Sequence, residues 1–307
     1  GNAIYEHNKD NDHHSDPAPA PLPTAREASV PTLEGALDQT GSITGPIAYG
    51  SYTDENHPVI YGTGYAGDTI NIYDNGVLIG TAIVAADGNW SFTPEAALND
   101  GSHSITITQS NSDGSVSKPS DDLSFIVDTV APLRPLFGDI IDNVGPITGP
   151  IANGATTDDA RPEVTGTGEP GNTITIFING NEAGKATVDS NGNWTWTPET
   201  DLNDGHYQLT ITETDKAGNV SPVSPTFDFN VDTSSPAKPA IPEVMDNHGD
   251  ITGPIHSGDV TDETKPTFNG GGAEPGEIIK VIDNGEVIGS TVVDDKGNWE
   301  WTPEDPL

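Results

Sequence analysis

The sequence contains no cysteine, and basic residues are scarce. Without cysteine no disulfide can stabilise the fold, so each folded unit must rely on its apolar core or on bound metal ions. Eleven Lys and Arg residues stand against 48 Asp and Glu residues, which gives a formal net charge of −37. Because such a chain repels phosphate backbones and anionic lipid surfaces, we expect no nucleic-acid partner and no membrane insertion, and we expect cations as partners.

Long apolar runs and catalytic motifs are also missing from the sequence. No segment approaches the roughly 18 apolar residues of a transmembrane helix, and no signal peptide is recognisable, a combination typical of an internal fragment. There is no His-Glu-x-x-His, no Gly-x-Ser-x-Gly and no phosphate-binding glycine loop. We therefore predict that the chain is not an enzyme.

Glycine and proline are abundant, with 35 and 26 copies, whereas only 32% of the residues are hydrophobic. This composition favours short strands and turns over helices. Trp90, Trp194 and Trp299 recur at a spacing of 104 or 105 residues, each inside a Gly-Asn-Trp phrase that continues to Thr-Pro-Glu. A period of this length is one small domain. We predict a linker over residues 1–30, domains over 31–132 and 133–236, and an incomplete third domain over 237–307 that lacks its last two strands.

Within each repeat, hydrophobic residues alternate with a period of two on either side of an Asn-Gly pair, at residues 75–76, 179–180 and 284–285. Asn-Gly is the strongest two-residue hairpin signal, because both positions of a type I′ turn need positive φ. About seven strands per repeat predict an all-β fold of tandem immunoglobulin-like β-sandwich domains. We expect the recurring Trp inside each core. The alternative, in which these Trp residues stack on carbohydrate, requires them to be exposed.

Aspartates recur at matched positions beside Gly, Asn, Thr or Pro. If the strands run alternately down and up, Asp38, Asp54 and Asp128 of the first repeat face Asp215 of the second. Like charges that converge in this way repel unless a cation lies among them, and Ca²⁺ accepts six to eight oxygen ligands in flexible geometry. We favour calcium at this joint. The alternative is that each aspartate merely caps a turn and keeps the surface solvated.

The motif string "DNVGPITGPIANGATTDDARPEVTGTGEPGNTITIFINGNEAGKATVDSNGNWTWTPE", continuing to "ETDKAGNVSPVS" and "VDT", resembles the bacterial immunoglobulin-like repeats of giant non-fimbrial adhesins exported by type I secretion. The resemblance covers residues 31–307. It implies an extended, calcium-stiffened, monomeric rod, secreted to the bacterial cell surface, which takes part in contact with host cells. It also implies calcium-binding roles for seven aspartates: Asp38, Asp54, Asp128, Asp142, Asp158, Asp215 and Asp232.

The first repeat departs from this pattern, since Gln109 and Asn111 replace Glu213 and Asp215. We therefore expect the junction between the linker and the first repeat to be metal-free or different. His13 and His14, with His7, form a weaker candidate for a transition-metal site in the linker.

Three functions remain open from the sequence. The first is a structural stalk that gives an adhesin reach and stiffness. The second is a lectin-like module that binds glycan directly, through its aromatic residues or through calcium. The third is an accessory domain of a secreted hydrolase. Near-identity of the repeats favours the stalk, because a binding site usually makes one copy differ from the others.

Overall fold

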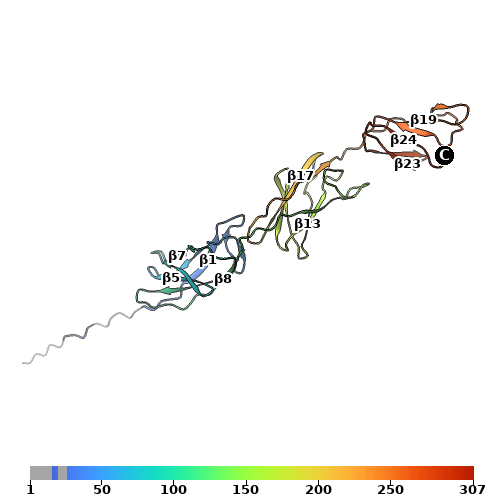
Figure 1. Ribbon diagram of the computed structural model, residues 1–307. Coiled ribbons are helices and arrows are strands. Elements are labelled where there is room, and N and C mark those ends of the chain that lie inside the picture. The colour runs from blue at the N-terminus through green and yellow to red at the C-terminus, as the bar shows by residue number, and fades with distance from the viewer. Residues whose placement is uncertain (1–15, 20–25) are drawn as a thin grey trace, which may run out of the picture. The chain divides into compact units, whose positions relative to one another are not determined.

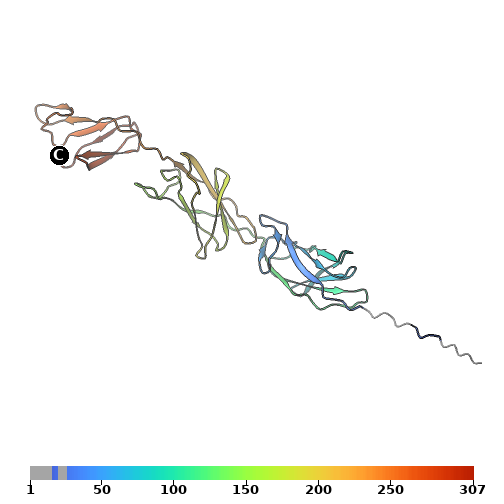
Figure 2. The ribbon, with the colours of Figure 1, turned by 180° about the vertical axis from the view of Figure 1, so that it is seen from behind.

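The computed structural model describes residues 16–19 and 26–307. The chain divides into two compact units, Gly1–Thr233 and Ser234–Leu307. Within the described residues every regular element is a β-strand, as Figures 1 and 2 show from opposite sides. No helix long and apolar enough to span a membrane occurs in this part of the chain. The candidate histidines of the linker, His7, His13 and His14, lie outside the described residues.

The first unit begins with nine strands in two sheets, here called the first repeat. The sheets have the strand orders β2-β1-β4-β7 and β3-β9-β8-β5-β6, and all neighbours are antiparallel except β3 and β9. The strands are β1 (Thr32–Asp38), β2 (Gly45–Pro46), β3 (Tyr52–Thr53), β4 (Val59–Thr63), β5 (Thr69–Asp74), β6 (Val77–Ile83), β7 (Asn89–Phe92), β8 (Gly101–Ser110) and β9 (Leu123–Val127).

The second repeat, also in the first unit, has the same topology. Its sheets have the orders β11-β10-β13-β16 and β12-β18-β17-β14-β15. The strands are β10 (Phe137–Asp142), β11 (Gly149–Pro150), β12 (Thr156–Thr157), β13 (Glu163–Thr167), β14 (Thr173–Ile178), β15 (Asn181–Thr187), β16 (Asn193–Trp196), β17 (Gly205–Thr214) and β18 (Phe227–Val231).

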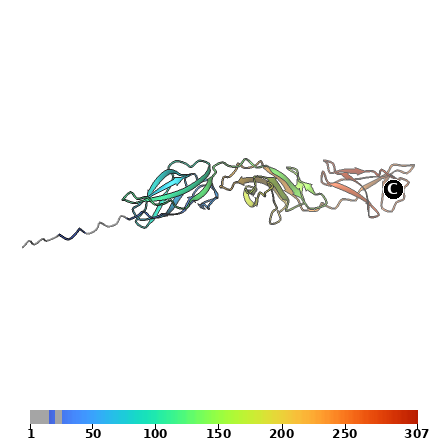
Figure 3. The same ribbon diagram turned by 90° about the horizontal axis from the view of Figure 1, so that it is seen from below.

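The second unit forms a smaller assembly, the third repeat, coloured orange to red in Figure 3. One sheet has the order β20-β19-β21-β24 and the other is the hairpin β22-β23. Its core consists of Ile279, Val293 and Trp299. The strands are β19 (Glu243–Asp246), β20 (Gly253–Ile255), β21 (Thr267–Gly270), β22 (Ile278–Asp283), β23 (Glu286–Val292) and β24 (Trp299–Trp301).

The prediction of tandem all-β sandwiches is confirmed, with one difference in strand number. The first and second repeats each contain nine strands where seven were predicted. The two additional strands are only two residues long and lie in the excursion between the first two long strands. They form because this excursion pairs with β1 and β9 in the first repeat and with β10 and β18 in the second.

The predicted hairpin turns and core positions are also confirmed. Asn75, Asn179 and Asn284 have φ of 49°, 52° and 48°, and the glycine after each also has positive φ, as a type I′ turn requires. Strand β5 shows the expected alternation, since Ile70 and Ile72 are buried while their neighbours are only partly covered. Each sandwich therefore packs one apolar face of each sheet against the other.

The recurring Trp residues lie inside the repeats. Trp90, Trp194 and Trp299 expose only 4%, 2% and 7% of their surface. The indole N–H of Trp90 donates to the carbonyl oxygen of Thr63 at 3.1 Å, so the polar edge of the ring is satisfied inside the core. This burial removes these three residues from the carbohydrate-stacking alternative, which needed exposed rings.

Candidate cation sites at the joint between repeats

The first acidic cluster lies where β1 ends. Asp38, the last residue of β1, is buried. Its Oδ2 accepts a hydrogen bond from Oγ1 of Thr53 at 2.6 Å, and its Oδ1 accepts from the backbone N–H of Thr40 at 2.9 Å. Thr53 ends the short strand β3. Because Thr53 is hydrogen-bonded to Asp38, the next residue, Asp54, lies beside the carboxylate of Asp38.

Burial and the neighbouring charge of Asp38 raise the pKa of Asp54 from 3.8 to about 6, and the two carboxyl groups are within hydrogen-bond range. Asp54 is 9% exposed, and its Oδ1 is buried with no hydrogen-bond partner among the described residues. The other oxygen lies so close to Gly41, which has φ of +73°, that a Cβ at that position would be 2.1 Å away. Asp54 is thus a buried, incompletely satisfied carboxylate next to a second carboxylate, an arrangement that favours a bound cation.

Glu55, which follows Asp54, is also buried but has hydrogen-bond partners for both oxygens. Oε2 accepts from Oγ1 of Thr40 at 2.6 Å and from the N–H of Gln39 at 3.2 Å, while Oε1 accepts from the N–H of His57 at 2.9 Å. Although burial opposes ionisation, these hydrogen bonds lower the pKa of Glu55 below its usual value. Glu55 therefore holds the loop after β1 and remains ionised.

The same cluster recurs in the other two repeats. In the second repeat, Oδ2 of Asp142 accepts from Oγ1 of Thr157 at 2.6 Å, and burial and the charge of Asp142 raise the pKa of Asp158. In the third repeat, Oδ2 of Asp246 accepts from Oγ1 of Thr261 at 2.6 Å. The clusters differ in burial, because Asp54 is covered whereas Asp158 is exposed.

A second pair of carboxylates lies at the joint between the first and second repeats. Asp128 follows β9, and its backbone N–H donates to the carbonyl oxygen of Thr53 at 2.9 Å. Burial, followed by repulsion from Asp215 and Asp100, raises the pKa of Asp128, and the side chains of Asp128 and Asp215 are within hydrogen-bond range. The predicted meeting of Asp128 with Asp215 across the joint is therefore present in the structure.

The loop of residues 215–219 makes the other contacts of this joint. Nδ2 of Asn219 donates to the backbone oxygen of Asp128 at 2.7 Å and to Oδ2 of Asp215 at 2.9 Å. The hydroxyl of Ser42 donates to the carbonyl oxygen of Gly218 at 2.8 Å. Lys216 places its amine 5.6 Å from the centre of the Tyr52 ring. These contacts hold the loop after β17 against the loops of the first repeat.

The predicted residues are therefore grouped as pairs. Asp38 lies with Asp54, and Asp128 lies with Asp215, in place of the single cluster of four that the sequence suggested. Within residues 16–19 and 26–307, no group of three or more His, Cys, Asp or Glu side chains has the spacing of a metal site. Oxygen ligands for an ion at either pair would also have to come from backbone carbonyls, side-chain amides or water.

In the second repeat, the predicted residues Asp142 and Asp158 form the corresponding pair, and the backbone N–H of Asp232 donates to Thr157 O at 2.9 Å as Asp128 does to Thr53. Sequence reasoning missed Asn219 and the threonines that bind the first aspartate of each cluster. The signal for those threonines was present, since each directly precedes the second aspartate in a Thr-Asp pair.

The first repeat carries amides where the second repeat carries acids. Gln109 and Asn111 stand 104 residues before Glu213 and Asp215. The side-chain oxygens at these matched positions accept the same backbone hydrogen bonds. At the first position, Oε1 of Gln109 accepts from the N–H of Tyr65 at 2.9 Å, and Oε1 of Glu213 accepts from the N–H of Glu169 at 2.8 Å. At the second position, Oδ1 of Asn111 accepts from the N–H of Ser115 at 3.0 Å, and Oδ1 of Asp215 accepts from the N–H of Asn219 at 2.9 Å.

The amide nitrogens have a different role from the second carboxylate oxygens. Nε2 of Gln109 donates to the backbone oxygen of Ser29 at 3.1 Å, and Nδ2 of Asn111 donates to that of Arg26. Glu213 and Asp215 have no hydrogen to donate there. Two ionised carboxylates can approach each other closely only when a donor or a cation lies between them, and at this joint Nδ2 of Asn219 is one such donor.

Comparison with known proteins gives a family. A sequence profile described as "Bacterial Ig-like domain" matches residues 29–129, 140–233 and 238–307. No curated protein is similar enough to the sequence to count as a match.

Several solved structures match the chain at low identity. The fibronectin(III)-like modules of CbhA from Clostridium thermocellum are 14% identical, with 64% of this chain and 92% of that chain covered and a TM-score of 0.37. A tetra-tandem repeat from the extending region of a large adhesion protein is 19% identical, with 84% and 66% covered and a TM-score of 0.27. The BSP domain of a biofilm associated protein is 25% identical, with 60% and 28% covered and a TM-score of 0.22.

Proposed function

Because the chain belongs to the family of bacterial Ig-like domains, we propose that it is a stalk segment of a bacterial surface adhesin in which bound Ca²⁺ stiffens the joints between repeats. In this proposal the parent protein is exported by type I secretion, and a region outside this segment contacts host cells. The repeats supply reach and rigidity, and they need no catalytic group.

The observation that carries the proposal is the exchange of amides for acids at matched positions. The side-chain amides of Gln109 and Asn111 donate hydrogen bonds directly to backbone oxygen atoms of the preceding segment. At the joint between the repeats, Asp215 instead lies beside Asp128, and their mutual repulsion contributes to the raised pKa of Asp128. A divalent cation would convert this repulsion into attraction on both sides of the joint.

The residues present fit an oxygen-seeking cation. Asp128 and Asp215 would hold one ion, and Asp38 and Asp54 would hold a second, with the buried Oδ1 of Asp54 gaining the partner that the protein does not provide. Calcium is the favoured ion because it accepts carboxylate, carbonyl and water oxygens together in irregular geometry. We assign the same role to Asp142, Asp158 and Asp232 in the second repeat.

Two further features support a stalk in preference to a lectin-like module. The hydrogen bond from threonine to the first aspartate of the acidic cluster recurs in all three repeats, as expected for a structural joint. The three recurring Trp residues are buried and offer no ring face to a glycan. An accessory domain of a secreted hydrolase could have the same calcium-bound joints, so these two features do not distinguish it from a stalk.

The experiment is calcium titration of the Asp215→Asn variant by calorimetry, with the whole chain. The substitution restores the amide found in the first repeat while keeping the side-chain shape. We expect calcium affinity at this joint to fall by about tenfold or more, a loss of about 1.4 kcal/mol or more. Asp201→Asn is the matched control, because Asp201 is exposed and its substitution removes the same charge from the same repeat.

Unchanged affinities and an unchanged number of calcium sites in Asp215→Asn would reject the assignment. Equal losses in both variants would also reject it, since that result would reflect net charge and not a specific site.

A further inference from the structure

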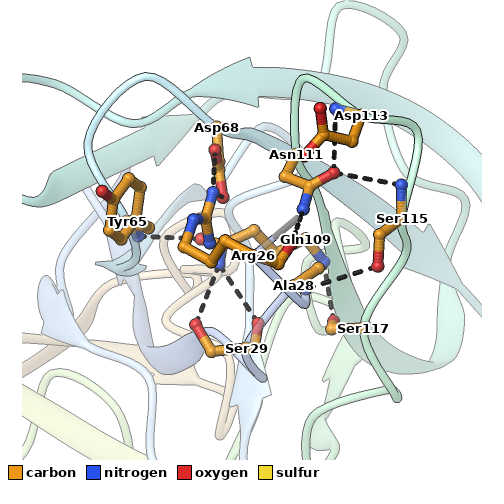
Figure 4. Close-up of polar contacts among 10 residues, drawn as sticks. All are labelled: Arg26, Ala28, Ser29, Tyr65, Asp68, Gln109, Asn111, Asp113, Ser115 and Ser117. Carbon is orange, nitrogen blue, oxygen red and sulfur yellow. Dashed lines mark hydrogen bonds and ion pairs between the residues drawn. The ribbon is translucent and has the colours of Figure 1, made fainter. Parts of the chain in front are cut away.

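One pole of the first repeat, against which residues 26–29 lie, binds a cation supplied by the chain itself, the guanidinium group of Arg26 (Figure 4). Nη2 of Arg26 lies 2.7 and 2.6 Å from the two carboxylate oxygens of Asp68. The guanidinium carbon is 3.7 Å from the centre of the Tyr65 ring, a distance at which the ring face attracts a cation. Asp68 is only 6% exposed, so its charge is paired in a largely desolvated site.

The acidic residue of this pole occupies a different position in the first repeat from the one it occupies in the second. The first repeat has the acid Asp68 and the amide Gln109, whereas the matched positions of the second repeat hold the amide Asn172 and the acid Glu213. In the second repeat these two groups satisfy each other, since Nδ2 of Asn172 donates to Oε1 of Glu213 at 3.1 Å. In the first repeat the acid is free to bind Arg26 instead.

The backbone around Arg26 is fixed by three more groups of the same pole, all drawn in Figure 4. Asn111 donates to the carbonyl oxygen of Arg26, Gln109 donates to that of Ser29, and the hydroxyl of Ser115 accepts from the N–H of Ala28 at 3.3 Å. The segment is thus held through both its side chain and its backbone. Every one of these contacts joins protein groups directly, with no pair of facing carboxylates.

We propose that this pole is a guanidinium-binding site that fixes residues 26–29 onto the first repeat without a metal ion. Arg26 supplies the positive charge that, under the proposed function, calcium supplies at the joint with the second repeat. The chain therefore carries two chemically distinct kinds of joint. One depends on the calcium concentration, and the other keeps residues 26–29 docked when calcium is absent.

Hydrogen–deuterium exchange of the whole chain tests the site through the peptide that covers residues 26–30. In chelator we expect slow exchange of this peptide in the wild type, and the same rate after calcium is added. In Arg26→Gln we expect exchange about tenfold faster or more, because the salt bridge and the ring contact are both lost. The core strand β8 of the same sample reports whether the first repeat remains folded.

Arg134→Gln is the matched control. Arg134 is exposed and lies in the connection before the second repeat, so the variant loses the same charge without touching the site. A second variant, Asp68→Asn, removes the partner of Arg26 and should give the same fast exchange of the peptide.

Fast exchange of this peptide in wild-type protein, slow exchange that requires calcium, or unchanged exchange in Arg26→Gln would each overturn the proposal. Because the decisive comparison is made in chelator, it stands whether or not calcium binds between the repeats. A failure of the proposed calcium sites would therefore be distinguished from a failure of the Arg26 site.

Discussion

At the scale of single residues, the balance of charge and burial at Asp54 is the most informative feature of the molecule. Its carboxyl group is buried and lies beside Asp38, and one of its oxygens has no hydrogen-bond partner within residues 16–19 and 26–307. Burial and repulsion from Asp38 raise its pKa to about 6 in the folded protein, from an ordinary value of 3.8. The folded state therefore binds a proton more tightly than the unfolded state.

This pKa shift gives a prediction for the protein in chelator. The stabilising contribution of protonated Asp54 is fully present below about pH 4 and is lost as the pH rises through about 6, a loss on the order of 3 kcal/mol. In Asp54→Asn, the free energy of unfolding of the first repeat should lose this part of its dependence on pH. Urea unfolding of both proteins at about pH 4.5 and pH 7 measures the difference.

Asp121→Asn serves as the control, because Asp121 is exposed and its carboxylate makes no hydrogen bond or ion pair with the described residues. Calcium should reduce the pH dependence of the wild type, since a bound cation stabilises ionised Asp54. If the stabilities of Asp54→Asn and the wild type respond equally to pH, the carboxylate of Asp54 is solvated and its pKa is not raised in the folded protein.

At the scale of strands, aromatic residues of each repeat pack closely against glycines of other strands, either within one sheet or across the two sheets. In the second repeat, Gly166 of β13 pairs with Trp194 of β16, and a Cβ at Gly166 would lie 2.6 Å from the indole. Gly184 of β15 lies in the same way against Trp196, where a Cβ would be 2.3 Å from the ring. The Trp side chains therefore require glycine at these two positions, since any larger residue would overlap the indole rings.

The Gly166→Ala variant should be destabilised, because the added methyl group forces the buried indole or the strand to move. Overpacking of a core typically costs about 1–3 kcal/mol. Chemical denaturation of the variant and the wild type gives this difference directly. Ser190→Ala, an exposed change in the same repeat, should leave stability unchanged. Equal stability of Gly166→Ala and the wild type would show that the Trp194 contact is loose.

The strands were predictable from the sequence, whereas the tight contacts between them were not. The turn at Asn179 follows from the positive φ that a type I′ hairpin imposes on two adjacent residues, which is a local requirement. The match between Gly166 and Trp194 depends on strand register across 28 positions, and the two-residue strands depend on the path of a long loop. Local patterns do not contain that information.

At the scale of the whole chain, the candidate sites could be predicted only in part for the same reason. Asp128 and Asp215 lie together as predicted from strand direction and from the position of each loop along the chain. The role of Asn219, which contacts both of them, depends on the turn of residues 215–219. The Arg26–Asp68 pair joins residues 42 positions apart and has no counterpart in the second repeat, so repetition could not reveal it.

Under the proposed function, calcium bound between repeats limits their relative motion. Extracellular calcium modules often bind in the range of about 10⁻⁴ to 10⁻³ M, so the joints would be rigid outside the cell and loose in the calcium-poor cytosol before export. The prolines in the connections, as in "VDTVAPLRP", restrict bending but leave rotation possible. A cation held by carboxylates from both sides of the joint adds the missing restraint.

Small-angle X-ray scattering of the chain, in millimolar calcium and in chelator, tests this claim most directly. We predict a longer and narrower distribution of interatomic distances in calcium, and a smaller change in the Asp128→Ala variant because the first joint has lost a ligand. Circular dichroism of the same samples establishes that the repeats are folded in both conditions. Identical scattering curves from folded protein with and without calcium would contradict the account and leave the aspartates as surface charge.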